Sequence, residues 1–331
     1  MKFIDNNSIT DPTINLAIEE YMLQHFGEEE TFLLFYINEP SIIIGRNQNT
    51  IEEINTDYVE ENNIKVVRRL SGGGAVYHDE GNLNFSFITK DDGESFHNFA
   101  KFTEPVVNAL NTLGVPAELI GRNDLLVEGR KISGNAQFST KGRMFSHGTL
   151  MFDSEIEHVV RALNVSKEKI ESKGIKSIRS RVANIKEYLD EPLTMEQLKE
   201  TLLCSIFDVE RVEDVPRYEL TEEDWQAIEK ISNERYKKWE WNYGKSPAYN
   251  VKASHKFPSG LVDIRLDVKK GIIEQCKIFG DFFGVGNIQD VEQALVGVRH
   301  ERKAVEKALA ELPIEHYLGK ITQEELIDLL Y

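Results

Sequence analysis

Hydrophobic and polar residues follow two kinds of spacing along this chain, and each spacing predicts one kind of element. Residues 82–89 alternate strictly, as expected for a strand with one buried face. The polar face of this run carries Asn82, Asn84 and Ser86, and the apolar face carries Leu83, Phe85 and Phe87. Residues 12–26 instead place apolar side chains every three or four positions, which predicts a helix.

The same two patterns predict an ordered series of elements along the rest of the chain. Further strands are predicted at 32–37, 41–45, 125–127, 131–138 and 143–152, and further helices near 56–62 and at 96–113, 195–207 and 222–235. Near the C-terminus, alternating runs at 249–257, 261–268 and 272–279 precede helices near 290–296, 300–311 and 322–330. We therefore expect an α+β protein with a first domain at 1–245 and a small α+β domain at 246–331.

The composition limits which classes of molecule this protein is expected to bind. The chain has 331 residues, enough for two domains, and a formal net charge of −17, which argues against nucleic acid or an anionic membrane as the main partner. It contains no apolar run of the ~18 residues that a membrane span needs. Asp5 interrupts the N-terminus before the apolar core of a signal peptide develops. Two cysteines cannot build a disulfide framework, so we expect a cytoplasmic protein.

The candidate chemistry is concentrated in residues 64–89. Three adjacent glycines, Gly72–Gly74, follow Arg68 and Arg69 and separate two extended runs. Each glycine costs about 0.5–1 kcal/mol relative to alanine, and close approach of backbone N–H groups to an anion beside an arginine is one reason to keep three. The alternative is a glycine-rich turn with a solvated arginine pair. The stretch lacks the GxxxxGK[ST] pattern of a P-loop, and Tyr77 stands where a dinucleotide-binding fingerprint needs Gly or Ala.

A second group of polar residues lies on the predicted strand 131–138. If that strand alternates, its polar side chains share one face and form the wall of a polar cavity; a solvent-facing edge is the alternative. These side chains are Lys131, Ser133, Asn135 and Gln137. The next strand places His147 and Thr149 on one face. A lone histidine is more often structural than catalytic, but one beside Lys131 gains weight as a site residue.

Residues 69–82 resemble the lipoate-binding loop of the lipoate–protein ligases, in the biotin/lipoate protein ligase family. The family signature is an Arg-x-Ser-Gly-Gly-Gly-Ala-Val-(aromatic)-His run followed by Gly-Asn. This chain has it as Arg69, Ser71, Gly72, Gly73, Gly74, Ala75, Val76, Tyr77, His78, Gly81 and Asn82. The family's essential lysine precedes a Val/Ile-Ser-Gly run, as Lys131 precedes residues 132–134 here. The basic segment 166–182 resembles the family's adenylate-binding loop, and the resemblance covers nearly the whole chain.

The resemblance implies a fold and a reaction. The implied fold is a large mixed β-sheet domain with flanking helices, followed by an accessory C-terminal domain. The implied reaction has two steps: lipoate and ATP form lipoyl-adenylate, and a lysine of an acceptor lipoyl domain then takes the lipoyl group. The implied acceptors are E2 subunits of 2-oxoacid dehydrogenases or the glycine-cleavage H protein.

The matched motifs also imply a role for individual residues, with Lys131 as the catalytic residue. The implied ATP or adenylate site comprises Arg69, Gly74, Ala75, Val76, Tyr77, His78, Asn82, Lys131, Gly174 and Ile175. The implied lipoate site comprises Arg69, Ser71, Gly72, Gly73, Gly74, Lys131, Ser133 and His147. Asp124 is a candidate ligand for Mg²⁺, an ion that proteins normally share with phosphates.

Other functions stay open on the sequence. A lipoyl or octanoyl transferase acting between carrier proteins needs a reactive cysteine, and the first 203 residues contain none. A non-catalytic lipoate or nucleotide sensor is disfavoured by the presence of Lys131. Biotin ligases share the reaction type, but their Gly-Arg-Gly-Arg-x-Gly-Arg loop is absent from this sequence.

Overall fold

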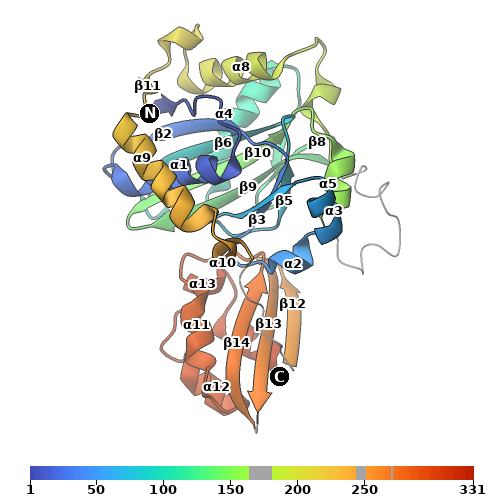
Figure 1. The fold of residues 1–331 in the computed structure, drawn as a ribbon, viewed down its shortest axis with the longest axis vertical. Coiled ribbons are helices and arrows are strands. Elements are labelled where there is room, and N and C mark those ends of the chain that lie inside the picture. The colour runs from blue at the N-terminus through green and yellow to red at the C-terminus, as the bar shows by residue number, and fades with distance from the viewer. Residues whose placement is uncertain (164–180, 244–250, 270) are drawn as a thin grey trace. The chain divides into compact units, whose positions relative to one another are not determined.

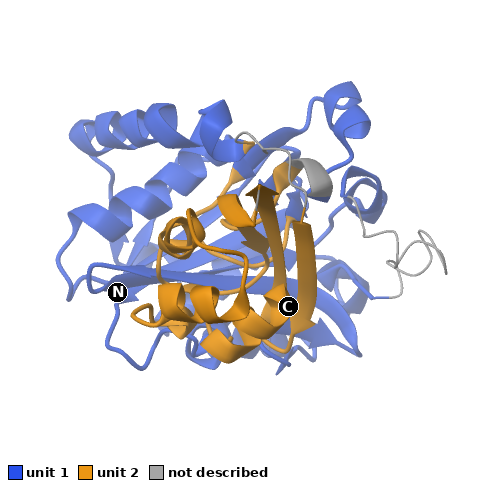
Figure 2. Ribbon diagram, turned by 90° about the horizontal axis from the view of Figure 1, so that it is seen from below, with its two compact units in different colours: residues 1–43, 52–67, 76–242 blue, residues 44–51, 68–75, 243–331 orange. Residues whose placement is uncertain are grey.

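The computed structural model describes residues 1–163, 181–243, 251–269 and 271–331. The chain forms two compact units whose segments interleave along the sequence (Figure 2). Unit 1 comprises Met1–Ile43, Glu52–Val67 and Val76–Asn242, and unit 2 comprises Ile44–Ile51, Arg68–Ala75 and Tyr243–Tyr331. The glycine-rich segment 68–75 therefore belongs to the same compact unit as the C-terminal part of the chain.

A mixed β-sheet forms the centre of unit 1. Its strands are β1 (Lys2–Ile4), β2 (Phe32–Ile37), β6 (Asn82–Lys90), β7 (Glu118–Ile120), β8 (Asp124–Val127), β9 (Arg130–Thr140), β10 (Arg143–Met151) and β11 (Arg217–Tyr218). Their order is β11-β1-β2-β6-β10-β9-β8-β7 (Figure 1). β1 pairs in parallel with β2 and β11, and all other neighbours are antiparallel. The sheet confirms the expected mixed architecture.

One face of this sheet is covered by α4 (Phe99–Thr112) and α8 (Met195–Phe207). The apolar side chains of β6 fill the core on that face, and the ring centroids of Phe87 and Phe102 are 6.0 Å apart. Burial of such side chains supplies the main driving force for folding, so the alternation within residues 82–89 fixes which face meets these helices. The alternation predicted for this strand is confirmed.

The opposite face of the sheet is covered by α1 (Pro12–His25), which in turn packs against α9 (Glu222–Ile231). α1 begins at Pro12 after Asp11, whose carboxylate accepts a hydrogen bond from Thr13 N, a usual N-cap arrangement. Asn84 and Ser86 of β6 and His147 and Thr149 of β10 lie on this face. His147, one of the candidate site residues, therefore lies on the side of the sheet that α1 covers.

A second, smaller sheet carries the glycine-rich segment. Its strands are β3 (Ser41–Ile44), β4 (Lys65–Arg68) and β5 (Val76–His78), in the order β4-β3-β5. Within the described residues, the other short helices of this part of the chain are α2 (Thr50–Glu53), α3 (Thr56–Glu61), α5 (Ile156–Ala162), η1 (Ile185–Tyr188), η2 (Val212–Asp214), η3 (Ser232–Tyr236) and α10 (Trp239–Asn242). The glycines connect β4 to β5 as the sequence pattern indicated.

The C-terminal part of unit 2 has its own sheet and core. Three strands, β12 (Val251–Phe257), β13 (Gly260–Lys269) and β14 (Ile272–Gly280), form an antiparallel meander. Four helices follow, namely α11 (Ile288–Leu295), α12 (Arg302–Leu309), α13 (Ile314–Leu318) and α14 (Gln323–Leu330). The expected α+β character of this region is confirmed. In the described part of the chain, no helix is long and apolar enough to cross a membrane.

Candidate functional site

Lys131 lies on a different face of β9 from the one that simple alternation predicts. The register of β9 against β8 shifts between Leu125 and Leu126, so that Ser133 and Lys131 face consecutive residues and Ile132 is an extra residue. A β-bulge of this kind breaks the alternation of side chains. A Cβ added at Gly134 would lie 3.0 Å from Lys131 Nζ, which places Lys131 on the face of Gly134.

The expectation that Lys131, Ser133, Asn135 and Gln137 share one face is therefore wrong. Asn135 Nδ2 donates to Ser133 Oγ at 3.2 Å, so these two side chains lie together on the opposite face from Lys131. Both are buried, on the side of the apolar core under α4. The polar wall around Lys131 is built instead from β6 and β10.

That wall is set by the pairing of β6 with β10. His147 pairs with Ser86, and Thr149 pairs with Asn84, so all four side chains share the face of Lys131. Thr149 Oγ1 also accepts a hydrogen bond from the N–H of Gly134 at 3.1 Å. The predicted placement of His147 and Thr149 on one face is confirmed, and it brings them to the same side of the sheet as Lys131.

Lys131 pairs with the candidate metal ligand. Its Nζ lies 2.9 Å from Asp124 Oδ1, and each side chain is 38% exposed, so the ammonium keeps access to solvent. The backbone of Lys131 is fixed independently: its N–H donates to Arg181 O at 2.7 Å, and its carbonyl accepts from Ala183 N at 3.0 Å. The lysine is thus held on rigid backbone with a polar, solvent-accessible head.

Each of the two site histidines has a buried hydrogen-bonding partner that the sequence pattern did not predict. Glu19 of α1 lies 3.0 Å from His147 Nδ1, and Asn38 Nδ2 lies 2.9 Å from His78 Nδ1. Both partners come from elements far away in the sequence, so local spacing gave no signal for them. An acid in the middle of the apolar helix 12–26 was the only hint of Glu19. These contacts orient the two imidazole rings.

Tyr77 and Asn82 of the matched loop are also buried. Asn82 Nδ2 donates to Asn84 Oδ1 at 3.1 Å, and the ring of Tyr77 stacks on His158 with centroids 6.2 Å apart. Burial, with a smaller contribution from Asp79, raises the pKa of the Tyr77 hydroxyl, which therefore stays protonated at neutral pH. Tyr77 acts in this unit as a packed, neutral aromatic.

The two arginines before the glycines are buried, so a solvated arginine pair is excluded. Arg68 is 8% exposed, and its guanidinium donates to the carbonyls of Gly45, Arg46 and Gln48 and to Thr50 Oγ1. Arg69 is 6% exposed and donates to Ser71 Oγ and to the carbonyls of Gly72 and Gly74. Each arginine thereby fixes the backbone of one loop in unit 2.

The structure accounts for each of the three glycines in a different way. A Cβ at Gly72 would overlap the carbonyl oxygen of Phe282, and Gly73 has φ +90°, which disfavours any side chain. A Cβ on Gly45 would in turn overlap the carbonyl of Gly73. Gly74 is exposed, and an added Cβ would meet nothing within 4 Å. Gly74 is therefore the glycine at which packing leaves room for a ligand.

The matched site residues divide between the two units. Unit 1 holds Val76, Tyr77, His78, Asn82, Asp124, Lys131, Ser133 and His147, and unit 2 holds Arg69, Ser71, Gly72, Gly73, Gly74 and Ala75. The other two expected residues, Gly174 and Ile175, lie outside the described residues, as does most of the basic segment 166–182.

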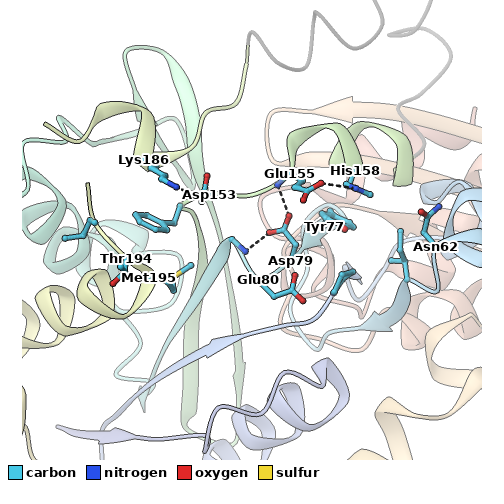
Figure 3. A pocket seen from close by; sticks show the side chains of 15 residues that line it. Asn62, Tyr77, Asp79, Glu80, Asp153, Glu155, His158, Lys186, Thr194 and Met195 are labelled. Atoms are coloured by element: carbon cyan, nitrogen blue, oxygen red, sulfur yellow. Dashed lines mark hydrogen bonds and ion pairs between the residues drawn. The ribbon is translucent and has the colours of Figure 1, made fainter. Parts of the chain in front are cut away.

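Unit 1 also has an open cleft beside the end of β5, with a volume of about 560 Å³. Figure 3 shows its polar lining, in which Asp79 accepts hydrogen bonds from the N–H groups of Gly81 and Glu155. Lys186 pairs with Asp153, and His158 Nε2 lies 3.1 Å from Glu155. These carboxylates are engaged with the protein itself. Among the described residues, no group of three His, Cys, Asp or Glu side chains could hold a metal ion.

Comparisons with known proteins cover the whole chain. A family model described as the lipoyl protein ligase A/B catalytic domain matches residues 11–207, and one described as the bacterial lipoate protein ligase C-terminus matches residues 246–330. The chain is 65% identical over 331 residues to the lipoate–protein ligase LplJ of Bacillus subtilis, covering 100% of both sequences. It is 59% identical over 330 residues to lipoate–protein ligase 1 of Staphylococcus aureus, again covering 100% of both.

Solved structures agree with these matches. The lipoate complex of P. falciparum LipL1 superposes with a TM-score of 0.82 at 24% identity, covering 99% of each chain, which shows the fold. A lipoate–protein ligase A bound with ATP has a TM-score of 0.61 at 28% identity and covers 71% of this chain and 94% of its own. A bipartite ligase of Thermoplasma acidophilum, described with its E2 lipoyl domain, has a TM-score of 0.65 at 29% identity, covering 76% and 98%.

Proposed function

The chain belongs to the lipoyl protein ligase A/B family, and from that premise we propose that it activates free lipoate with ATP and transfers it to an acceptor lysine. It is a ligase that attaches lipoate to proteins, and it uses ATP and lipoate as substrates. The observation that best supports the proposed mechanism is the placement of Lys131 on a fixed strand, beside Asp124 and on the polar face of the sheet. An ammonium held there suits chemistry at a phosphate.

The proposed first step joins lipoate to AMP. A carboxylate oxygen of lipoate attacks the α-phosphate of ATP, the bond to the β-phosphate breaks, and pyrophosphate leaves. Negative charge grows on the α-phosphate oxygens, so a cation placed beside them lowers the barrier. Two unit charges about 4 Å apart interact by ~4 kcal/mol at an effective dielectric of 20. We assign that role to Lys131.

In the second step the acceptor lysine replaces AMP. Its neutral amine attacks the carbonyl carbon of the mixed anhydride, AMP leaves with the bonding electrons, and the amine loses one proton to solvent. The N–H groups around Gly74, with Arg69 shaping the loop, are proposed to hold the anionic end of lipoate or the adenylate phosphate. We also propose His78, Asn82 and His147 of unit 1 as polar residues that contact the substrates.

Lipoate-dependent exchange of pyrophosphate into ATP tests the function. We expect exchange that requires lipoate, because step one is reversible. With a purified lipoyl domain added, the acceptor should gain one lipoyl group by mass, and AMP should be released. Binding of lipoate without exchange would identify a sensor instead. Parallel assays with an E2 lipoyl domain and an H protein would identify the acceptor, which we propose to be one of these.

We further propose that Asp124 takes part in binding Mg²⁺. Mg²⁺ is usually held by one or two carboxylates together with substrate phosphates, so a single half-exposed carboxylate beside the catalytic lysine fits such a site. The bound ion would neutralise charge on the phosphate oxygens.

Asp124→Asn is expected to raise the Mg²⁺ concentration for half-maximal exchange by about tenfold, because it removes the anionic ligand. Titrating Mg²⁺ in the exchange assay measures this. The competing role, in which Asp124 only positions Lys131, predicts a lower rate at saturating Mg²⁺ with an unchanged half-saturation value. The two results separate the roles in one titration.

Neither cysteine is expected to take part in the reaction. Burial raises the pKa of the Cys204 thiol, and burial raises the pKa of Cys276, in the core of the C-terminal sheet, to about 12. The attacking species in acyl-cysteine chemistry is the thiolate, so both environments disfavour it.

A Cys204→Ser/Cys276→Ala variant should keep its rate of lipoate transfer within about twofold, since neither thiol takes part in the proposed steps. Steady-state transfer to a lipoyl domain, with a melting curve as the folding control, measures this. Complete loss of transfer in a folded double variant would instead support a transferase that forms an acyl-cysteine.

A further inference from the structure

Phe283 lies directly against the glycine-rich segment of unit 2. It follows β14 by three residues and is 5% exposed. The side chain of the preceding residue, Phe282, packs in the apolar core of the C-terminal sheet and helices. The ring of Phe283 instead contacts two of the glycines that precede β5, about 210 positions earlier in the chain.

The ring of Phe283 lies so close to the loop backbone that the loop residues it contacts must be glycine. A Cβ at Gly73 would lie 3.0 Å from Phe283 Cζ and 3.3 Å from its Cε1. A Cβ at Gly72 would lie 3.3 Å from Phe283 Cδ1 and would overlap the carbonyl oxygen of Phe282. Because both glycines lack a side chain, the aromatic ring and a peptide carbonyl can approach the loop backbone.

The backbone on either side of Phe283 is fixed. Val285 N and Gly286 N both donate to the carbonyl of His316, at 2.8 and 3.0 Å. Before Phe283, Gly280 N donates to Asn47 O at 2.7 Å, which ties the end of β14 to the other short segment of unit 2. Phe283 is therefore presented to the glycines from a rigid support.

Arg69 holds the loop by its carbonyl groups. Its Nη2 donates to Gly72 O at 2.7 Å and to Gly74 O at 2.8 Å, and the same Nη2 lies 3.0 Å from the Cβ position of Gly73. Polar contacts from Arg69 and an aromatic contact from Phe283 therefore both restrain the loop. Three consecutive glycines would otherwise populate many conformations.

We propose that Phe283 is a positioning residue for the lipoate site: its ring holds Gly72 and Gly73 in the loop conformation that binds lipoate. This inference rests on the proposed function, in which the glycine-rich loop contacts lipoate. Without the ring, only a fraction of molecules has the binding conformation, and the apparent affinity for lipoate falls by that fraction. Saturating lipoate selects the binding conformation again, so the maximal rate recovers.

The test compares Phe283→Ala with Phe279→Ala in the full-length enzyme. Phe279 lies in β14 of the same unit, and its ring stacks over the guanidinium of Arg265 at 5.1 Å. In lipoate-dependent ATP–pyrophosphate exchange, Phe283→Ala should raise the KM for lipoate about tenfold if one molecule in ten keeps the binding conformation. Its kcat should stay near the wild-type value. Phe279→Ala should leave both constants unchanged, and Phe283→Leu should restore part of the affinity.

An unchanged KM for lipoate in folded Phe283→Ala would overturn the inference, and so would a fall in kcat alone. If Phe283→Ala does not fold, the KM of Phe283→Leu decides in the same way. Hydrogen exchange adds a readout independent of turnover: the amides of residues 72–74 should exchange faster in the Phe283 variants than in Phe279→Ala, and equal rates would contradict the proposal. A wild-type enzyme without lipoate-dependent exchange would instead overturn the proposed function.

Discussion

Lys131→Ala is expected to lower the rate of lipoate-dependent ATP–pyrophosphate exchange by about 10²–10³-fold, the usual cost of removing one preorganised electrostatic group. The loss should appear in kcat, because the ammonium is proposed to act on charge that develops only in the transition state. Steady-state exchange kinetics at saturating lipoate and ATP measure it.

The fold should survive this substitution. Lys131 and Asp124 are each 38% exposed, and ion pairs this accessible contribute about 0–1 kcal/mol to stability. A matched control is Lys101→Ala, since Lys101 pairs with Asp92 at 3.0 Å and is 49% exposed. That variant should lose similar stability and no activity. A folded Lys131→Ala enzyme with wild-type exchange would remove Lys131 from the catalytic role.

Gly81→Ala is expected to destabilise the protein by about 3 kcal/mol, at the upper end of what overpacking costs. A Cβ at Gly81 would overlap the carbonyl of Asp153 and lie 2.6 Å from Ser154 N. At the same contact, Phe152 N and Asp153 N donate hydrogen bonds to Gly81 O at 3.0 and 2.9 Å. Because the obstacle is backbone, no rotamer change relieves it.

Urea denaturation measures this cost as a shift of the midpoint at constant m-value. Gly74→Ala is the stability control, since a Cβ there meets nothing within 4 Å. Its midpoint should stay near that of the wild type. Equal midpoints for Gly81→Ala and the wild type would show that the two backbone segments can separate at little cost. In that case the Gly-Asn pair of the motif would need a functional reason instead.

The alternation of apolar and polar residues correctly predicted the faces of a strand whose pairing with its neighbours is uninterrupted. The alternation in residues 82–89 was predicted correctly because β6 pairs without interruption with β2 and β10, and one apolar face has a core to fill. The reasoning failed on β9 for the opposite reason. The bulge at Ile132 depends on how β9 pairs with β8, and the residues of β9 alone do not encode it.

The sequence likewise predicted only part of what the structure shows for the glycine motif. The sequence indicated that Gly72, Gly73 and Gly74 need a special reason, because glycine loses more conformational entropy on folding than any other residue. It favoured one reason, a bound anion, for all three, with a glycine-rich turn as the alternative. In the structure Phe282 and Phe283 account for the first two, from a part of the chain where no chemistry was expected. Only Gly74 keeps the space that the original interpretation requires.

The sequence by itself therefore determined the family and most of the order of elements, since contiguous motifs and side-chain periodicity are properties of short segments. The tertiary structure decided which of those residues face one another. It placed Lys131 with His147 and Thr149 rather than with Ser133, and it gave His147 the distant partner Glu19. The contact between His147 and Glu19 joins residues 128 positions apart. The geometry of such contacts follows from strand register and close packing, which no local pattern contains.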